Sequence, residues 1–151
     1  MEYQHYLYLK SDDSLNFYPT NSPGKFYSKL PQSLHLQGLW ECALLQLQYV
    51  HSYFGDAANI PNNLLFCSNI CTESIVSDRK IPILRRVCNV LQSGLTNQVI
   101  EVDIKNLIYV PVVCEYIDVI SIYITDEHGK YVSFSKGPLH TTLHLRHMKS
   151  F

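Results

Sequence analysis

Two histidines near the end of the chain, His140 and His144, have the spacing of a metal-binding pair. On a helix an H-x-x-x-H spacing places both rings on one face. On a strand it separates the two Cα atoms by about 13 Å, which is too far for one ion. The surrounding segment LHTTLHLRHM alternates apolar and polar residues, as strands do. The pattern therefore favours solvated or interface histidines over metal ligands.

Five cysteines could supply a nucleophile, a metal site or disulfides: Cys42, Cys67, Cys71, Cys88 and Cys114. The count is odd, and no C-x-x-C pair occurs. Cys67 and Cys71 fall in one expected strand, where about 13 Å would separate them, too far for one disulfide. None of the five stands in a recognisable catalytic motif with a base to activate the thiol. We expect reduced cysteines and assembly in a reducing compartment.

Glu101 and Asp103 form the acid pair best placed for catalysis. They share one face of the expected strand VIEVDI, about 7 Å apart along the backbone. Paired carboxylates hydrolyse glycosides, but a solvated strand face carries the same pattern. No glycine-rich phosphate loop, G-x-S-x-G or H-E-x-x-H motif occurs. The sequence therefore favours a protein that is not an enzyme and that needs no cofactor or metal.

Composition narrows the class of protein further. The chain has 151 residues, a one-domain length, so we expect a single domain over residues 1–151. Apolar residues make up 46% and charged residues 17%, with a formal net charge of -1. That balance is typical of a globular protein, and without a basic stripe we expect no specific nucleic-acid binding.

Neither secretion nor a membrane span is expected. The N-terminal segment MEYQHYLYLK lacks the apolar core of a signal peptide. The longest apolar tract, residues 106–125, is interrupted by Pro111, Glu115 and Asp118. Charges at such positions are costly in hydrocarbon, so buried strands are the better interpretation.

Almost every segment of the chain has the pattern of a strand. We expect eight to ten strands, in segments 3–10, 25–30, 39–50, 64–71, 81–91, 99–104, 115–124, 131–135 and 139–148. Residues 125–130 predict a hairpin turn with Gly129 at its bend. Strands without intervening helices predict an all-β fold, either a sandwich, a barrel or a jelly roll.

Alternation assigns side chains to faces in the first and last strands. In segment 3–10 we expect Tyr3, His5, Leu7 and Leu9 on one face and Tyr6, Tyr8 and Lys10 on the other. In segment 139–148 we expect Leu139, Thr141, Leu143 and Leu145 to face inward and His140, Thr142, His144 and Arg146 to face outward. Amphipathic tyrosines such as Tyr6 and Tyr8 suit protein interfaces.

Segment 39–50 does not alternate simply. Trp40, Cys42 and Leu44 share one phase, and Leu45, Leu47 and Tyr49 share the other. A β-bulge, or a strand covered on both faces, explains the change of phase. Trp40 is the only tryptophan, and we expect it to be a buried core anchor.

Two ordered groups of residues resemble one protein family, the penton or minor capsid proteins of Polinton/Maverick elements and adintoviruses. The first group contains Tyr18, Pro19, Asn21, Ser22, Phe26, Leu30, Leu36, Gly38, Trp40, Glu41, Ala43 and Leu44. The second contains Asp126, Gly129, Val132, Phe134, Gly137, Leu143, Leu145 and Arg146. Together the two regions cover a little over half of the chain, and the middle from His51 to Asn106 matches only in its strand-like pattern.

The resemblance implies a single jelly roll that forms homopentamers at the five-fold vertices of an icosahedral capsid. Its neighbour would be a double jelly-roll major capsid protein. The protein would be made in the host cytoplasm or nucleus and would end in the virion. We take as subunit-interface candidates Tyr6, Tyr8, Lys10, His140, His144 and Arg146.

Two other classes remain open at this point. A non-viral jelly-roll binding module, lectin-like or cytokine-like, would share the fold. A glycosidase built on a β-sandwich would use Glu101 and Asp103.

Overall fold

The computed structural model describes residues 4–51, 63–76, 78–88, 98–132, 134 and 137–148. These residues form β-strands joined by turns and loops, with no helix among them. The eleven strands are β1 (Gln4–Lys10), β2 (Lys25–His35), β3 (Trp40–His51), β4 (Asn63–Ser68), β5 (Ser74–Val76), β6 (Arg79–Ile81), β7 (Ile83–Cys88), β8 (Gln98–Asp103), β9 (Val110–Pro111), β10 (Tyr116–Thr125) and β11 (His140–His147). In the part of the chain that is described, no helix is long and apolar enough to cross a membrane.

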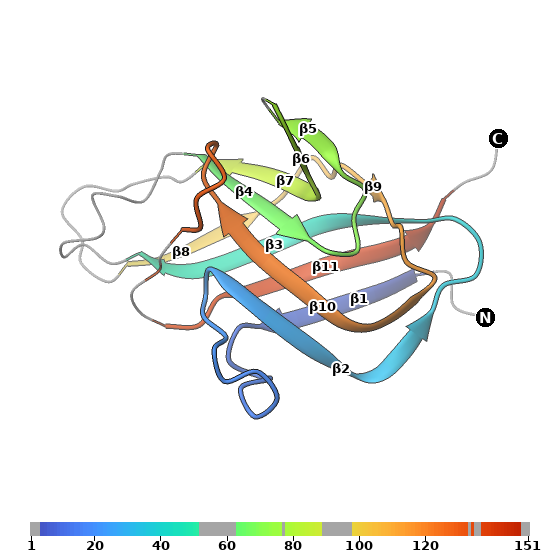
Figure 1. Ribbon diagram of the computed structural model, residues 1–151, viewed down its shortest axis with the longest axis horizontal. Helices are drawn as coiled ribbons and strands as arrows, with labels where there is room; N and C mark the ends of the chain where they lie inside the picture. The colour runs from blue at the N-terminus through green and yellow to red at the C-terminus, as the bar shows by residue number, and fades with distance from the viewer. Residues whose placement is uncertain are drawn as a thin grey trace.

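Two antiparallel sheets pack face to face as a β-sandwich (Figure 1). The first sheet has the order β1-β11-β3-β8, and β9 also pairs with β3. The second sheet has the order β2-β10-β4-β7, and β5 pairs with β6 in a separate hairpin. The expected all-β class is confirmed.

The structure has one strand more than the upper limit that we expected. The polar segment TESIVSDRK contains the β5–β6 hairpin, which the sequence pattern did not predict. Of the expected segments, Tyr3, residues 89–91 and residues 133 and 135 lie outside the described residues. The described part of the expected strand 131–135 forms no strand, and Tyr131 makes only an isolated bridge with Thr125. The turn at 126–130 is present: Asp126 N–H donates to the Lys130 carbonyl at 2.9 Å, and Gly129 has a φ of 85°.

The core lies between the two sheets and is built from their inward faces. Its fully buried side chains include Phe26, Leu44, Leu47, Phe66 and Ile122. The change of phase in β3 is a β-bulge, because the register with β11 shifts between the pairs Thr142↔Gln46 and Leu143↔Leu44 and leaves Leu45 without a partner there. The bulge lets β3 present both of its apolar phases to the core.

A second, smaller cluster lies on the outer face of the second sheet. Leu65, Cys67 and Ile81 form it, with Tyr123 and Val76 packed against them. The β5–β6 hairpin thus covers part of the face of β4, β7 and β10. This cover explains why β4 is buried along both faces.

Strand β2 forms one edge of the second sheet, in agreement with the lysines of segment 25–30. It continues beyond that segment, through Pro31. Its register with β10 shifts between the pairs Ile117↔Leu34 and Val119↔Lys29, so Pro31 lies where the ladder is irregular. An edge with a bulge tolerates proline because no ladder N–H is required there.

One expectation about the cysteines is wrong. Cys67 and Cys71 do not share a strand, because β4 ends at Ser68 and the chain turns, with Cys71 N–H donating to the Ser68 carbonyl. Cys71 then forms an isolated bridge with Val112. The strand spacing of about 13 Å therefore does not apply to this pair. All five cysteines are nonetheless free thiols.

Candidate functional site

The six interface candidates lie together on β1 and β11, at the outer face of the first sheet. Tyr6 is directly opposite His144, and Lys10 is directly opposite His140. Tyr8 is 75% exposed and Tyr6 is 48% exposed. The alternation that we inferred for both strands therefore places these side chains on one surface. In the structure they form two separate groups, which the alternation did not predict.

The first group, the His144 cluster, consists of Gln4, Tyr6, Glu41, Tyr109, His144 and Arg146. The Tyr6 ring stacks on the His144 ring, with centroids 4.6 Å apart and planes at 17°. The Tyr109 hydroxyl lies 2.7 Å from His144 Nδ1, and Gln4 Oε1 lies 3.1 Å from Nε2. The amide oxygen only accepts, so we assign the Nε2–H tautomer, with the Tyr109 hydroxyl donating to Nδ1.

His144 differs from the solvated histidine that alternation indicates. It points to the outer face, yet only 8% of it is exposed, because Tyr6 and Tyr109 cover it. Burial, and then the nearby Arg146 charge, lower the pKa of His144 below its ordinary value. A pKa below 6.5 favours the neutral ring at pH 7, and with both nitrogens bonded within the cluster the ring serves as a packing and hydrogen-bonding centre.

Arg146 fixes the Tyr109 side of this cluster. Its guanidinium carbon lies 3.4 Å from the centre of the Tyr109 ring, a cation–π arrangement. Its Nε donates to Glu41 Oε1 at 2.7 Å, across the β11–β3 pair. The cluster thus joins β1, β3, β11 and the loop before β9 into a defined polar and aromatic surface.

The second group lies further along the same two strands. Tyr8, Lys10 and His140 line a shallow hollow of about 290 Å³, together with Asp13 and Gln48. No hydrogen bond inside the protein anchors the Tyr8 ring among the described residues. This half of the surface offers an exposed aromatic ring beside charged groups, which is a composition that suits protein contact.

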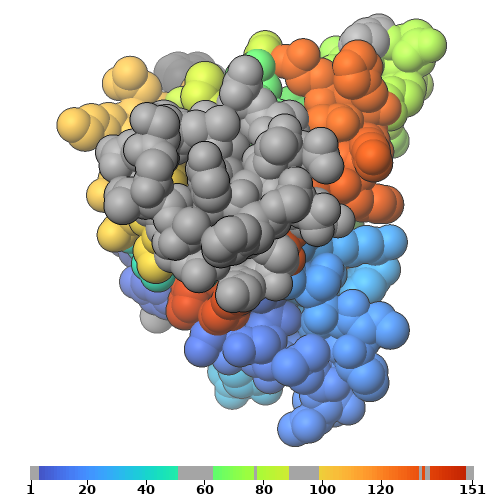
Figure 2. Space-filling model, turned by 90° about the vertical axis from the view of Figure 1, so that its left-hand side faces the viewer, coloured from blue at the N-terminus to red at the C-terminus, as the bar shows by residue number. Residues whose placement is uncertain are grey.

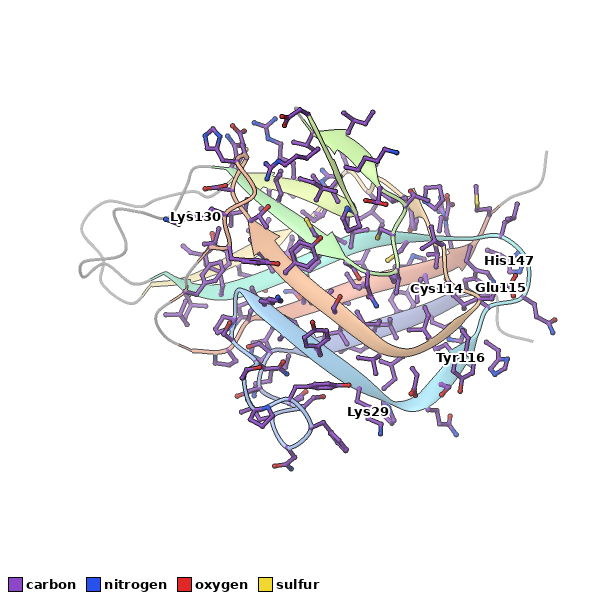
Figure 3. All side chains as sticks on the ribbon, in the orientation of Figure 1. Lys29, Cys114, Glu115, Tyr116, Lys130 and His147 are labelled. Carbon is purple, nitrogen blue, oxygen red and sulfur yellow. The ribbon has the colours of Figure 1, made fainter. Side chains whose placement is uncertain are left out.

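Trp40 is buried, with 5% of its surface exposed, at the end of the sandwich that Figure 3 marks with His147. Its Nε1–H donates to the Gln37 carbonyl at 3.0 Å, and its ring packs between His5 and His147. Gly38 has a φ of 87°, and a Cβ there would lie 2.9 Å from the His147 ring. The glycine is needed for both reasons.

Three of the five thiols considered for catalysis are buried, and the acid pair is exposed. Burial raises the pKa of Cys67 and of Cys71 to about 12, and raises the pKa of Cys42 well above its ordinary value. Glu101 and Asp103 are exposed on β8, where Glu101 accepts a hydrogen bond from Gln46 at 2.6 Å. Within the described ranges, no group of histidine, cysteine and acid side chains could hold a metal ion.

Sequence reasoning missed Tyr109, which completes the His144 cluster. It is 35 positions from His144 in the chain and lies in a loop, so no local periodicity could connect the two. It also missed a hollow beside the β5–β6 hairpin that Arg79, Lys80 and Tyr131 line, because that hairpin itself was not predicted.

The fold and this surface define a β-sandwich that presents a polar and aromatic outer face. No protein-family model matches the chain, and no curated protein matches it. Its function is therefore inferred from geometry and from sequence resemblance.

Proposed function

We propose that this chain is a minor capsid, or penton, protein that forms pentamers at the five-fold vertices of an icosahedral capsid. The observation that carries the proposal is a nested pattern of strand pairing. Among the eight strands of six or more residues, the first pairs with the last, β1 with β11. The second pairs with the second-last, β2 with β10, and the third with the third-last, β3 with β8. The central two, β4 and β7, pair with each other.

Nested pairing of this kind is what a long antiparallel ribbon produces when it is rolled into two facing sheets. That arrangement is the jelly roll, which viral capsid domains use. The order therefore supports a single jelly roll, the fold that the penton resemblance implies. Lectins share the fold, so the fold alone does not distinguish a capsid protein from a lectin. The choice between these functions rests on the sequence resemblance and on the surface.

The surface supports a contact role. Tyrosines and arginine are enriched at protein interfaces, and Tyr6, Tyr8 and Arg146 lie together on the first sheet. A structural subunit works by shape, so it needs rigid faces. The His144 cluster supplies one, because its hydrogen bonds and stacked rings hold four chain segments in place.

Co-assembly with a double jelly-roll major capsid protein tests the proposal. The two proteins are expressed together and the particles are imaged by electron cryo-microscopy with icosahedral averaging. We expect density for five copies of this chain at each five-fold vertex. Capsids that close without it would contradict the proposal, and specific binding of a glycan or a receptor by a monomer would favour the binding-module class.

Surface variants sharpen that experiment. Replacing Tyr6 and Tyr8 together by alanine should reduce incorporation into particles. The matched control is Tyr116→Ala, which removes a tyrosine that is 54% exposed on β10, in the other sheet. Equal incorporation of both variants would exclude the first-sheet face as a contact surface.

A further inference from the structure

A hollow of about 410 Å³ lies between the β5–β6 hairpin and the end of β10. Arg79, Lys80, Tyr123, Thr125 and Tyr131 line it. Two of these side chains are cations, and none of them is an acid. We call this site the cationic hollow.

Two acids near the cationic hollow, Glu127 and Asp126, are already engaged. The Glu127 carboxylate pairs with Arg86, and its carbonyl accepts a hydrogen bond from Arg79. Asp126 Oδ1 accepts the backbone N–H groups of His128 and Lys130. Lys80 contacts no carboxylate of the described residues. Its positive charge is thus available to a partner.

Exposed apolar surface borders this free charge. Ile75 is directly opposite Lys80 in the hairpin and is 76% exposed. Side chains of directly opposite residues lie on one face of an antiparallel pair. Tyr131 is 50% exposed, and Lys25 Nζ lies 4.9 Å from its ring centre. The site therefore suits a carboxylate that is accompanied by apolar side chains.

The chain carries such a group on its turn segment, residues 11–24. Asp12 pairs with Lys10 at 3.7 Å, but Asp13 is exposed, and its carboxylate contacts no cation of the described residues. Leu15 is 41% exposed. Phe17 is 62% exposed even with Lys29 Nζ 4.6 Å from its ring centre.

The two surfaces lie apart on the second sheet, whose strand order is β2-β10-β4-β7. The turn segment precedes β2 and lies along its outer edge, whereas the β5–β6 hairpin packs on β4 and β7 and the hollow extends from the hairpin to β10. Figure 1 places the turn segment at the bottom and the hairpin at the top, and Figure 2 shows the same separation after a quarter turn. Figure 3 labels Lys29 on β2 and Lys130 in the turn that follows β10.

We propose that the cationic hollow of one copy binds the Asp13–Phe17 turn of the next copy, head to tail. Asp13 would approach Lys80, and Leu15 and Phe17 would pack on Tyr131 and Ile75. Different patches on different sides of one subunit make a heterologous contact, which generates a ring when the rotation closes. The inference rests on the proposed pentamer and names its interface.

A charge swap tests this contact. Lys80→Glu and Asp13→Lys each place like charges together, so each should weaken self-association by at least about tenfold. The double variant restores opposite charges and should recover most of the association. Sedimentation velocity over a wide concentration range measures all three against the unaltered chain.

Matched controls reverse charges elsewhere. Lys105→Glu and Asp103→Lys alter exposed residues near the end of β8, in the first sheet, and should leave association unchanged. If Lys80→Glu and Asp13→Lys associate as tightly as these controls, the proposed contact is wrong, while the pentamer proposal stays intact. An unaltered chain that sediments as a monomer throughout would also overturn the contact, and the capsid proposal would then be decided by co-assembly.

Discussion

The side chain of Asn21 pairs with both backbone polar groups of Tyr27 along the outer edge of β2. Its Nδ2 donates to the Tyr27 carbonyl at 2.8 Å, and the Tyr27 N–H donates to Oδ1 at 2.9 Å. Two residues further on, the Lys29 N–H donates to the Ser14 hydroxyl at 3.1 Å, and Pro31 has no N–H. The turn segment thus closes the edge to which a foreign strand could otherwise add.

Replacing Asn21 by alanine should reopen that edge. We expect a loss of about 1 kcal/mol in the free energy of unfolding, from the two lost hydrogen bonds, and faster aggregation. Urea unfolding and light scattering measure the two effects. Asn16→Ala, which truncates an exposed asparagine of the same turn segment, is the control. Identical aggregation of the two variants would show that Asn21 does not protect the edge.

Truncating Trp40 should destabilise the sandwich strongly. Trp40→Ala removes a buried aromatic side chain and its hydrogen bond to Gln37, so we expect a loss of about 3–5 kcal/mol. Its neighbour Leu39 is 71% exposed, so Leu39→Ala should change stability by less than about 0.5 kcal/mol. Urea unfolding followed by circular dichroism compares them, and a Trp40→Ala protein as stable as the Leu39→Ala control would refute the anchoring role.

Acid should weaken the fold through His144. Its pKa in the folded chain is below the ordinary value of 6.5, so the unfolded chain binds more protons just below that pH. The contribution of His144 to stability is therefore complete above pH 6.5 and declines as the pH falls from there toward the folded pKa.

The variant His144→Gln should flatten this dependence, whereas His140→Gln, at an exposed position of the same strand, should preserve it. Unfolding free energies measured at a series of pH values and constant ionic strength give the two slopes. Equal slopes in this range would mean that His144 is not the titrating group.

Thiol labelling should separate the cysteines by burial. In the folded protein a maleimide should react first with Cys88, the exposed thiol, and more slowly with the half-buried Cys114. The buried thiols with raised pKa values, Cys42, Cys67 and Cys71, should react only after unfolding. Mass spectrometry of digested samples identifies the labelled sites, and rapid labelling of Cys42 in the folded state would contradict its burial in the core.

Local patterns predicted those features of the fold that depend on neighbouring residues. The break in alternation after Leu44 predicted either a bulge or a strand covered on both faces, and the structure has a bulge at Leu45. The alternation of β11 placed His144 on the outer face correctly. The β5–β6 hairpin escaped prediction because two strands of three residues are too short to show a period.

The candidate site was less predictable, because it is assembled over long sequence distances. His144 is buried by Tyr6 on β1 and by Tyr109 from a loop, and neither contact leaves a trace in the sequence around His144. The cationic hollow likewise joins Arg79 and Lys80 to Tyr131, 51 positions beyond Lys80 in the numbering. The face on which a residue lies within its strand can be predicted from neighbouring residues. A surface site depends on which distant segments pack together, and the local sequence does not show this.

The mass of the protein in solution tests the central claim most directly. Light scattering on the purified chain, supported by negative-stain images, should give about 87 kDa, five copies of the 17.4 kDa chain, with five-fold rings. A stable trimer would contradict a vertex pentamer. So would a monomer that stays a monomer when the major capsid protein is added.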